Sequence, residues 1–221
     1  MRQRRAAIYG GTFDPVHNGH IEVARRVQKL FALDEVIFVP ACVPPHKRNA
    51  RVTSAFHRFA MLALATEEDD RLSVSTIELD QPDRPYAVET VARMQEKLGS
   101  GYRLFFLMGA DSWAEITTWR DWQHLLKMSD QIVMTRPGYQ LEARSVDGAA
   151  IADSRGLGAE EITALLDESE GPRTFLSDAV FADVSATAIR AAAREGRAED
   201  LRQLVPSSVA GYIEKYGFYK K

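Results

Sequence analysis

The chain has 221 residues, a length that suits one α/β domain with an added helical part. Its 45% hydrophobic and 27% charged content is that of an ordinary globular protein, and a formal net charge of −3 gives no basic surplus for binding nucleic acid. No apolar run approaches the ~20 residues that span a bilayer, so no membrane contact is expected. The single cysteine, Cys42, excludes an internal disulfide, and the expected location is the cytoplasm.

Apolar runs alternate with helical patterns over the first 136 residues. Strands are expected at 6–9, 35–40, 72–77, 103–108 and 131–135, with a later one at 174–176. Runs that are apolar throughout, such as Val36-Ile37-Phe38-Val39, are typical of a parallel sheet that is covered on both faces. The alternation therefore predicts a doubly wound α/β fold.

Two helices between these strands are predicted from apolar residues at i, i+3, i+4 and i+7 spacing. The face of the first is expected to consist of Phe56, Phe59, Ala60, Ala63 and Leu64. The face of the second is expected to consist of Val88, Val91, Ala92 and Leu98, with Gly99 ending the helix.

The rest of the chain differs in composition. Residues 140–171 are rich in small and acidic residues, which predicts a surface excursion that buries little apolar surface and carries a helix around 159–166. In the C-terminal part, 181–221, Ser185 is expected to cap a helix that Gly196 ends. A short helix at 200–204 and a last one opened by Pro206 follow. We therefore predict a single domain, 1–221, with an α/β core over 1–180.

The strongest functional pattern is Gly10-Gly11-Thr12-Phe13-Asp14-Pro15-Val16-His17-Asn18-Gly19-His20, between a short strand and a helix. Two glycines after a strand let the backbone approach a bound group, and the start of the helix favours an anion such as phosphate. His17 and His20 share a face of the first turn and can both reach that anion. Alternatively, a His-x-x-His pair could be a metal site or two surface histidines.

Two further patterns carry positive charge. Pro44-Pro45-His46-Lys47-Arg48 follows the second strand, so its Lys47 faces the same edge of a parallel sheet as the first pattern. Ser185-Ala186-Thr187-Ala188-Ile189-Arg190 places a hydroxyl at the start of a helix and Arg190 one turn later. Each pattern alone is also compatible with an ordinary solvated turn or a capped helix.

Met108-Gly109-Ala110-Asp111-Ser112 follows the fourth predicted strand. Gly109 permits close approach of a nucleotide, while Asp111 could accept from ribose, position a magnesium-bound phosphate or cap the following helix. Thr118-Trp119-Arg120-Asp121-Trp122 comes next; an indole can stack on an aromatic ring or pack a helix, and we favour Trp119 for stacking and Trp122 for packing.

Taken in order, these motifs resemble the HxGH nucleotidyltransferase superfamily and, in their full form, the bacterial nicotinate-nucleotide adenylyltransferases. The resemblance covers nearly the whole chain and includes at least five ordered motifs, with a counterpart for Arg136-Pro137-Gly138-Tyr139. It implies a Rossmann-like fold and transfer of the adenylyl group of ATP to nicotinate mononucleotide, with release of pyrophosphate, in NAD biosynthesis. ATP and nicotinate mononucleotide are then the partners, and a homo-oligomer is compatible with this interpretation.

The resemblance assigns roles residue by residue. His17 and His20 would be catalytic. The residues expected to bind ATP are Gly10, Gly11, Thr12, Phe13, His17, Gly19, His20, Gly109, Asp111, Ser112, Ser185, Ile189 and Arg190. The residues expected to bind the acceptor nucleotide are Asp14, His46, Lys47, Tyr86, Ala87, Trp119, Arg120 and Arg136. Mg²⁺ is expected to bind mainly through the ATP phosphates, without a protein metal site.

Some features depart from this family or point elsewhere. Pro85-Tyr86-Ala87 stands where the family commonly has Ser-Tyr-Thr, which puts the contacts to the pyridine ring in doubt. Lys127-Met128-Ser129 is similar to an ATP motif of class I aminoacyl-tRNA synthetases but lies at a predicted helix end, without that motif's second lysine. A pantetheine-phosphate or cytidylyl transferase and a non-catalytic nucleotide sensor are the alternative functions.

Overall fold

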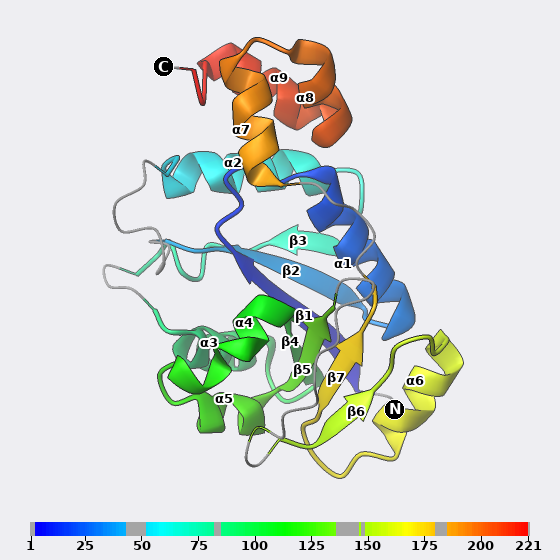
Figure 1. Ribbon diagram of the computed structural model, residues 1–221. Helices are drawn as coiled ribbons and strands as arrows, with labels where there is room; N and C mark the ends of the chain where they lie inside the picture. The colour runs from blue at the N-terminus through cyan, green and yellow to red at the C-terminus, as the bar shows by residue number, and fades with distance from the viewer. Residues whose placement is uncertain are drawn as a thin grey trace.

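The computed structural model describes residues 3–42, 52–81, 85–135, 146, 149–179 and 185–220. Within these ranges seven strands form one sheet in which every neighbouring pair is parallel (Figure 1). The strands are β1 (Arg4–Gly11), β2 (Glu35–Pro40), β3 (Leu72–Val74), β4 (Tyr102–Gly109), β5 (Asp130–Met134), β6 (Ile151–Asp153) and β7 (Thr174–Ser177). Their order in space is β3-β2-β1-β4-β5-β7-β6, so the predicted doubly wound α/β fold is confirmed.

Helices cover both faces of the sheet. One face carries α1 (Asn18–Leu30), α2 (Ala55–Thr66) and α6 (Ala159–Asp167); the other carries α3 (Ala87–Leu98), α4 (Ala110–Ala114), the 3₁₀ turn η1 (Ile116–Thr118) and α5 (Trp122–Met128). Val36 and Phe38 of β2 point into the first core, and Ile37 and Val39 into the second. The uninterrupted apolar run of β2 follows from this double coverage. No helix in the described ranges is both long and apolar enough to cross a membrane.

The predicted strands are confirmed with two differences. β2 has the predicted bounds, and β1, β4, β5 and β7 lie within two residues of theirs. β3 ends at Val74 because the chain turns at Thr76, whose carbonyl accepts from the backbone N–H groups of Leu79 and Asp80. The edge strand β6 was not predicted; its three residues pair with β7 but carry no long apolar run.

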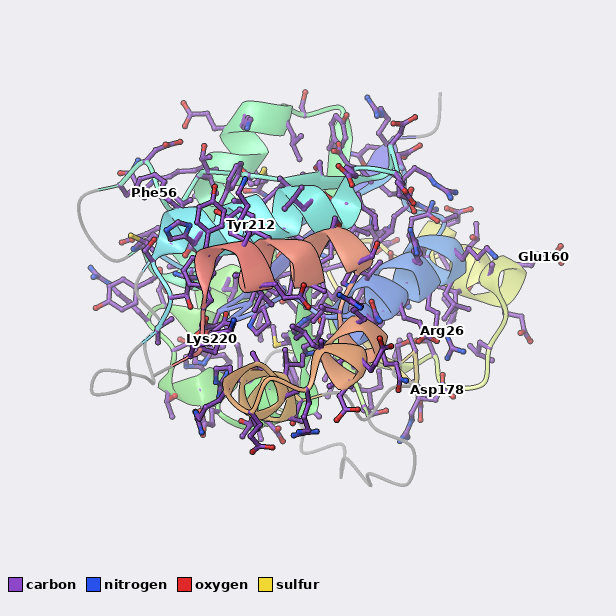
Figure 2. All side chains as sticks on the ribbon, turned by 90° about the horizontal axis from the view of Figure 1, so that it is seen from above. Arg26, Phe56, Glu160, Asp178, Tyr212 and Lys220 are labelled. Carbon is purple, nitrogen blue, oxygen red and sulfur yellow. The ribbon has the colours of Figure 1, made fainter. Side chains whose placement is uncertain are left out.

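The buried face of α2 was predicted wrongly. Arg58, Met61, Leu62 and Thr66 are buried, whereas the side chain of Phe56 is 74% exposed. A charged residue, Arg58, opens the buried face and Thr66 ends it, so a search for apolar spacing selects the neighbouring stripe instead. α2 also lies between the sheet and the last helix, α9 (Ser207–Tyr216), which runs along it with Tyr212 close by (Figure 2).

α3 follows its prediction more closely. Val88 and Val91 are buried as expected, and Gly99 ends the helix with a φ of 76°. Ala92 is exposed instead, because Thr90 and Met94 complete the buried face of this helix.

The C-terminal helices begin and end close to their predicted positions. The Ser185 hydroxyl accepts from the backbone N–H of Ala188 at 3.2 Å and so caps α7 (Ala186–Arg194). Gly196 follows that helix with a φ of 69°. α8 (Ala198–Leu204) precedes Pro206, the residue before α9, and Figure 1 shows the three helices packed beyond α2.

The expectation that residues 140–171 bury little apolar surface is wrong for the described part, 149–171. Ile162 and Leu166 of α6 are 0% and 1% exposed and belong to the same core as α1. The buried Arg5 guanidinium of β1 contacts the Asp167 carboxylate at the end of this helix at 3.1 Å. The segment is therefore an integral layer of the fold, although its small and acidic composition suggests a surface loop. The predicted helix itself is confirmed.

The strand order determines where a ligand can bind. The order in which strands are added to the sheet reverses between β1 and β4. From β1 the sheet grows in one direction through β2 and β3, and from β4 it grows in the other direction through β5, β7 and β6. In open parallel sheets a crevice forms at such a switch point, outside the carboxyl ends of the strands. Gly11 and Gly109 end these two strands, so the motifs that follow them meet at this crevice.

We expect Ile162→Ala to lower the free energy of unfolding by about 2–5 kcal/mol, because it removes a fully buried side chain from the main core. Glu168→Ala, at an exposed position just after α6, should change it by less than about 0.5 kcal/mol. Urea denaturation of both variants measures the difference. Equal stabilities would mean that α6 is not part of the core.

Candidate active site

The two histidines of the first motif lie against each other at the start of α1. Their rings are stacked, with centroids 3.6 Å apart and planes inclined by 27°. The backbone N–H of His17 donates to Nδ1 of His20 at 3.2 Å. Nδ1 of His20 therefore carries no proton, and the neutral ring bears its hydrogen on Nε2. This arrangement leaves an Nε2–H donor for a ligand at the end of β1.

Burial keeps both histidines neutral at pH 7. It lowers the pKa of His17 to about 4. Burial, together with the neighbouring His17, places the pKa of His20 well below its usual value. Tyr9 and Phe13 surround the His20 ring, with centroid distances of 6.0 and 5.0 Å. In the free protein the pair thus offers hydrogen-bond donors and not positive charges.

Gly10 and Gly11, at the end of β1, differ in the space that surrounds them. A Cβ added to Gly11 would lie 2.8 Å from Cζ of Phe13, a distance that real Cβ atoms essentially never show. At Gly10 the nearest atom, Cζ of Phe106, would be 3.8 Å away, an ordinary contact. Phe13 itself has a positive φ of 49°, which folds its ring back over the end of β1. The absence of a side chain at Gly11 therefore leaves room for the Phe13 ring in this position.

Arg58 of α2 connects the loops that follow β1 and β2, and our sequence analysis missed it. Only 1% of its surface is exposed. Its guanidinium donates to the carbonyls of Thr53 at 2.9 Å, Thr12 at 2.6 Å, Ala41 at 2.5 Å and Cys42 at 3.3 Å. An arginine within an otherwise apolar helix pattern is the signal that could have identified it.

Asp14, expected to contact the acceptor nucleotide, is only 4% exposed. Its Oδ1 accepts from the Tyr219 hydroxyl at 2.8 Å, and its Oδ2 accepts from the backbone N–H of Thr53 at 3.4 Å. Its backbone carbonyl accepts from Nη1 of Arg190 at 2.8 Å. The structure therefore brings Asp14 together with the C-terminal part of the chain.

The start of α7 lies beside the first motif. Arg190 reaches the Asp14 carbonyl, and its Nη2 also donates to the Thr187 hydroxyl at 3.1 Å. Ser185 is exposed, while Ile189 is fully buried and packs into the core. The histidine motif at 10–20 and the motif at 185–190 thus meet in space. Ile189 packs into the core and so fixes the position of α7.

Gly109 ends β4 and is the residue before α4. A Cβ added there would meet no atom within 4 Å, so this backbone is open to close approach. The cap of α4 is Gly109 and not Asp111, which lies inside the first turn with an exposed carboxylate. Ser112 is half-buried beside it.

Tyr86 and Arg120, both expected on the acceptor side, are brought together. The Arg120 guanidinium carbon lies 4.7 Å from the centroid of the Tyr86 ring, which is 46% exposed. Trp119 packs edge-on against Phe106 of β4 at 6.2 Å. Trp119 and Trp122 are both partly buried against the core of α3–α5, so both indoles take part in packing.

Three expected site residues, His46, Lys47 and Arg136, lie outside the described residues. Among the residues that are described, no group of three or more His, Cys, Asp or Glu side chains could hold a metal ion. Lys127-Met128-Ser129 lies at the junction of α5 and β5, as predicted, with Ser129 buried.

The chain also matches a protein family and several known proteins over nearly its whole length. Residues 8–192 match the Cytidylyltransferase-like family. A probable nicotinate-nucleotide adenylyltransferase of Thermoanaerobacter sp. is 38% identical over 220 residues, covering 100% of this chain and 96% of the relative. A probable nicotinate-nucleotide adenylyltransferase of Desulfatibacillum aliphaticivorans is 36% identical, covering 97% of this chain and 99% of the relative. In fold, the chain is similar to Plasmodium falciparum nicotinic acid mononucleotide adenylyltransferase complexed with NaAD, with a TM-score of 0.70, 18% identity and coverage of 98% and 97%.

The depressed pKa of His17 predicts a specific acid sensitivity. Between pH 6.5 and 4 the unfolded chain binds a proton at this position and the folded protein does not, so stability falls as the pH drops through this window. Between pH 7 and pH 4.5 the free energy of unfolding should fall by about 2 kcal/mol less in His17→Gln than in the parent protein. Urea unfolding at the two pH values measures this difference. His124→Gln, at an exposed position, is the control and should follow the parent protein; a His17→Gln profile parallel to that of the parent would contradict the burial argument.

Proposed function

Because the chain belongs to the Cytidylyltransferase-like family, and within it to the nicotinate-nucleotide adenylyltransferases, we propose that it transfers the adenylyl group of ATP to nicotinate mononucleotide. The products are nicotinate adenine dinucleotide and pyrophosphate, in NAD biosynthesis. The observation that carries this proposal is the stacked, neutral histidine pair at the start of α1, beside the switch point of the sheet.

The chemistry needs no nucleophile from the protein. A phosphate oxygen of the mononucleotide attacks the α-phosphorus of ATP, the bond to the bridging oxygen breaks, and pyrophosphate leaves with that electron pair. Catalysis then depends on alignment of the two substrates and on stabilisation of charge at phosphorus. The Nε2–H of His20 is oriented to donate to a phosphate oxygen, and His17, stacked on it, holds the triphosphate from the same side.

Other residues share the binding of ATP. Arg190 lies within reach of the same loop and supplies the positive charge that the neutral histidines lack. The backbone at 10–13 and Gly19 line the entry to α1. Gly109 admits the nucleoside close to β4, where Asp111 and Ser112 meet its ribose. Ser185 and Ile189 place the start of α7 against the phosphates.

The acceptor is assigned to the opposite side of the crevice. Trp119 stacks on the pyridine ring, and Arg120, held over Tyr86, attracts its carboxylate. The first N–H groups of α3, from Ala87 onwards, are donors for that carboxylate. His46, Lys47 and Arg136 are assigned to the acceptor's phosphate and pyridine ends by the family resemblance alone.

Mg²⁺ fits this donor set as a companion of ATP. Its preference for phosphate oxygens and water suits a crevice in which Asp111 presents an exposed carboxylate at the start of α4. The phosphate oxygens of ATP would hold the ion, and the negative charge of the exposed Asp111 carboxylate would favour it nearby. When bound, Mg²⁺ withdraws negative charge from the phosphates that the protein's own groups orient.

His20→Ala should lower turnover by about 10²–10⁴ without unfolding the protein, because it removes a positioned donor to phosphate. His124→Ala, on the exposed face of α5, is the matched control and should keep the parent rate. Pyrophosphate release from ATP with nicotinate mononucleotide or phosphopantetheine, and from CTP with an acceptor of cytidylyl transferases, measures both activity and substrate class. Near-normal turnover of a folded His20→Ala protein would remove this residue from the mechanism.

We further expect nicotinate mononucleotide to be preferred over its amide by at least ~10-fold in kcat/KM. A carboxylate accepts from the N–H groups of α3 and is attracted by Arg120, whereas the amide NH₂ would face other donors and remain unsatisfied. Steady-state rates with each acceptor at fixed ATP and Mg²⁺ test this. Equal efficiencies would mean that the acceptor pocket has been assigned to the wrong residues.

A further inference from the structure

The C-terminal part of the chain is attached to the first motif at three points. Nδ2 of Asn18, at the start of α1, donates to the Gln203 carbonyl of α8 at 2.9 Å. Arg190 of α7 donates to the Asp14 carbonyl, and the Tyr219 hydroxyl donates to the Asp14 carboxylate, each at 2.8 Å. Figure 1 shows α7, α8 and α9 together beyond α2, with α9 packed on α2.

Tyr219 reaches Asp14 because the chain turns sharply after α9. Gly217 ends that helix with a φ of 65°, and Tyr219 itself has a φ of 65°. A bulky residue adopts this left-handed conformation only where its surroundings enforce it. Burial and the nearby Asp14 charge raise the pKa of Tyr219, so its hydroxyl stays protonated and donates.

Both carboxylate oxygens of Asp14 are engaged within the protein. Oδ1 binds Tyr219, and Oδ2 binds the N–H of Thr53, whose carbonyl in turn accepts from Arg58. Arg58 then returns to the carbonyl of Thr12, two residues before Asp14. The loop that leads to His17 is thus enclosed by a continuous set of hydrogen bonds, and the Tyr219 hydroxyl closes it on its outer side.

We propose that Tyr219 is a positioning residue for the reaction: by fixing the Asp14 carboxylate it holds the loop 12–17 so that the histidine pair is aimed at the phosphates of ATP. Asp14 on this view is the anchor of the loop and not a ligand of the acceptor nucleotide. The proposal rests on the function proposed above. It predicts that a change at the last turn of the chain, remote in sequence from every motif, alters the handling of ATP.

The test is Tyr219→Phe, which removes one hydroxyl and keeps the ring. We expect kcat/KM for ATP to fall by about 5- to 100-fold, with a raised KM for ATP, because a displaced loop misaligns the phosphate contacts. The KM for nicotinate mononucleotide should stay within about twofold, since the groups assigned to its pyridine end, on α3 and around Trp119, make no contact with Tyr219 or Asp14. A purely structural role would reduce the active fraction and lower kcat alone, leaving both KM values unchanged.

Tyr212→Phe is the matched control. Its hydroxyl also makes a 2.8 Å hydrogen bond from the C-terminal part, to Nδ1 of His57, but that bond does not reach the loop 12–17. The control should keep the parent KM for ATP at a similar melting temperature. In a double-mutant cycle, Tyr219→Phe should add little to Asp14→Ala, because both changes remove the same contact. A parent-like KM for ATP in Tyr219→Phe, equal effects at both tyrosines, or full additivity with Asp14→Ala would each overturn the proposal.

Calorimetric binding of a non-hydrolysable ATP analogue separates this proposal from the proposed function. If the parent protein releases no pyrophosphate with nicotinate mononucleotide, the proposed acceptor is wrong. Weaker analogue binding by Tyr219→Phe than by Tyr212→Phe would still support the positioning role. Equal binding by the two variants would refute it, whatever the acceptor proves to be.

Discussion

The buried guanidinium of Arg58 is the interaction on which the candidate site depends. The loops after β1 and β2 leave the sheet with backbone carbonyls that the strand ladders no longer satisfy, and Arg58 donates to four of them. Burial lowers its pKa, while the carboxylates of Asp14 and Glu78 act in the opposite direction and stabilise the charge. A lysine, with its single nitrogen, could not span carbonyls on two different loops. The shape of the loop that carries the histidine motif is therefore determined by Arg58 of α2 as much as by the motif's own residues.

This scaffold explains how a histidine pair can be buried beside a site for a highly charged ligand. Burial keeps both rings neutral, with Tyr9 and Phe13 against the ring of His20, so the pair contributes directed N–H donors whose orientation is determined by stacking and by the His17 backbone. Positive charge comes from Arg190, which lies on another element and remains partly exposed. Because the histidines supply the hydrogen-bond donors and Arg190 supplies the charge, the donors can be buried and rigid without leaving an unpaired cation in the core.

Those features that depend on local patterns could be predicted from the sequence. The bounds of β2, the Ser185 cap of α7 and the histidine motif all follow from residues within a few positions of each other. The features that sequence reasoning missed depend on contacts between distant segments. Arg58 and Thr12 are 46 residues apart, and Tyr219 and Asp14 are 205 apart. A polar residue on a buried face, as in α2, or a strand formed by pairing alone, as in β6, has no periodic signal in a single sequence.

The C-terminal helices also cannot be separated from the rest of the fold. Leu201, Val209 and Ile213, from α8 and α9, belong to the same core as β1 and α1, so burial is continuous from the sheet to the last helix. β1 leads into the first motif, and Tyr219, just after α9, contacts the loop of that motif. Asp14 receives hydrogen bonds from Arg190 of α7, from Tyr219 just after α9 and from Thr53 of the loop before α2, so the C-terminal part of the chain and the loop after β2 together hold the residue that precedes the histidine pair.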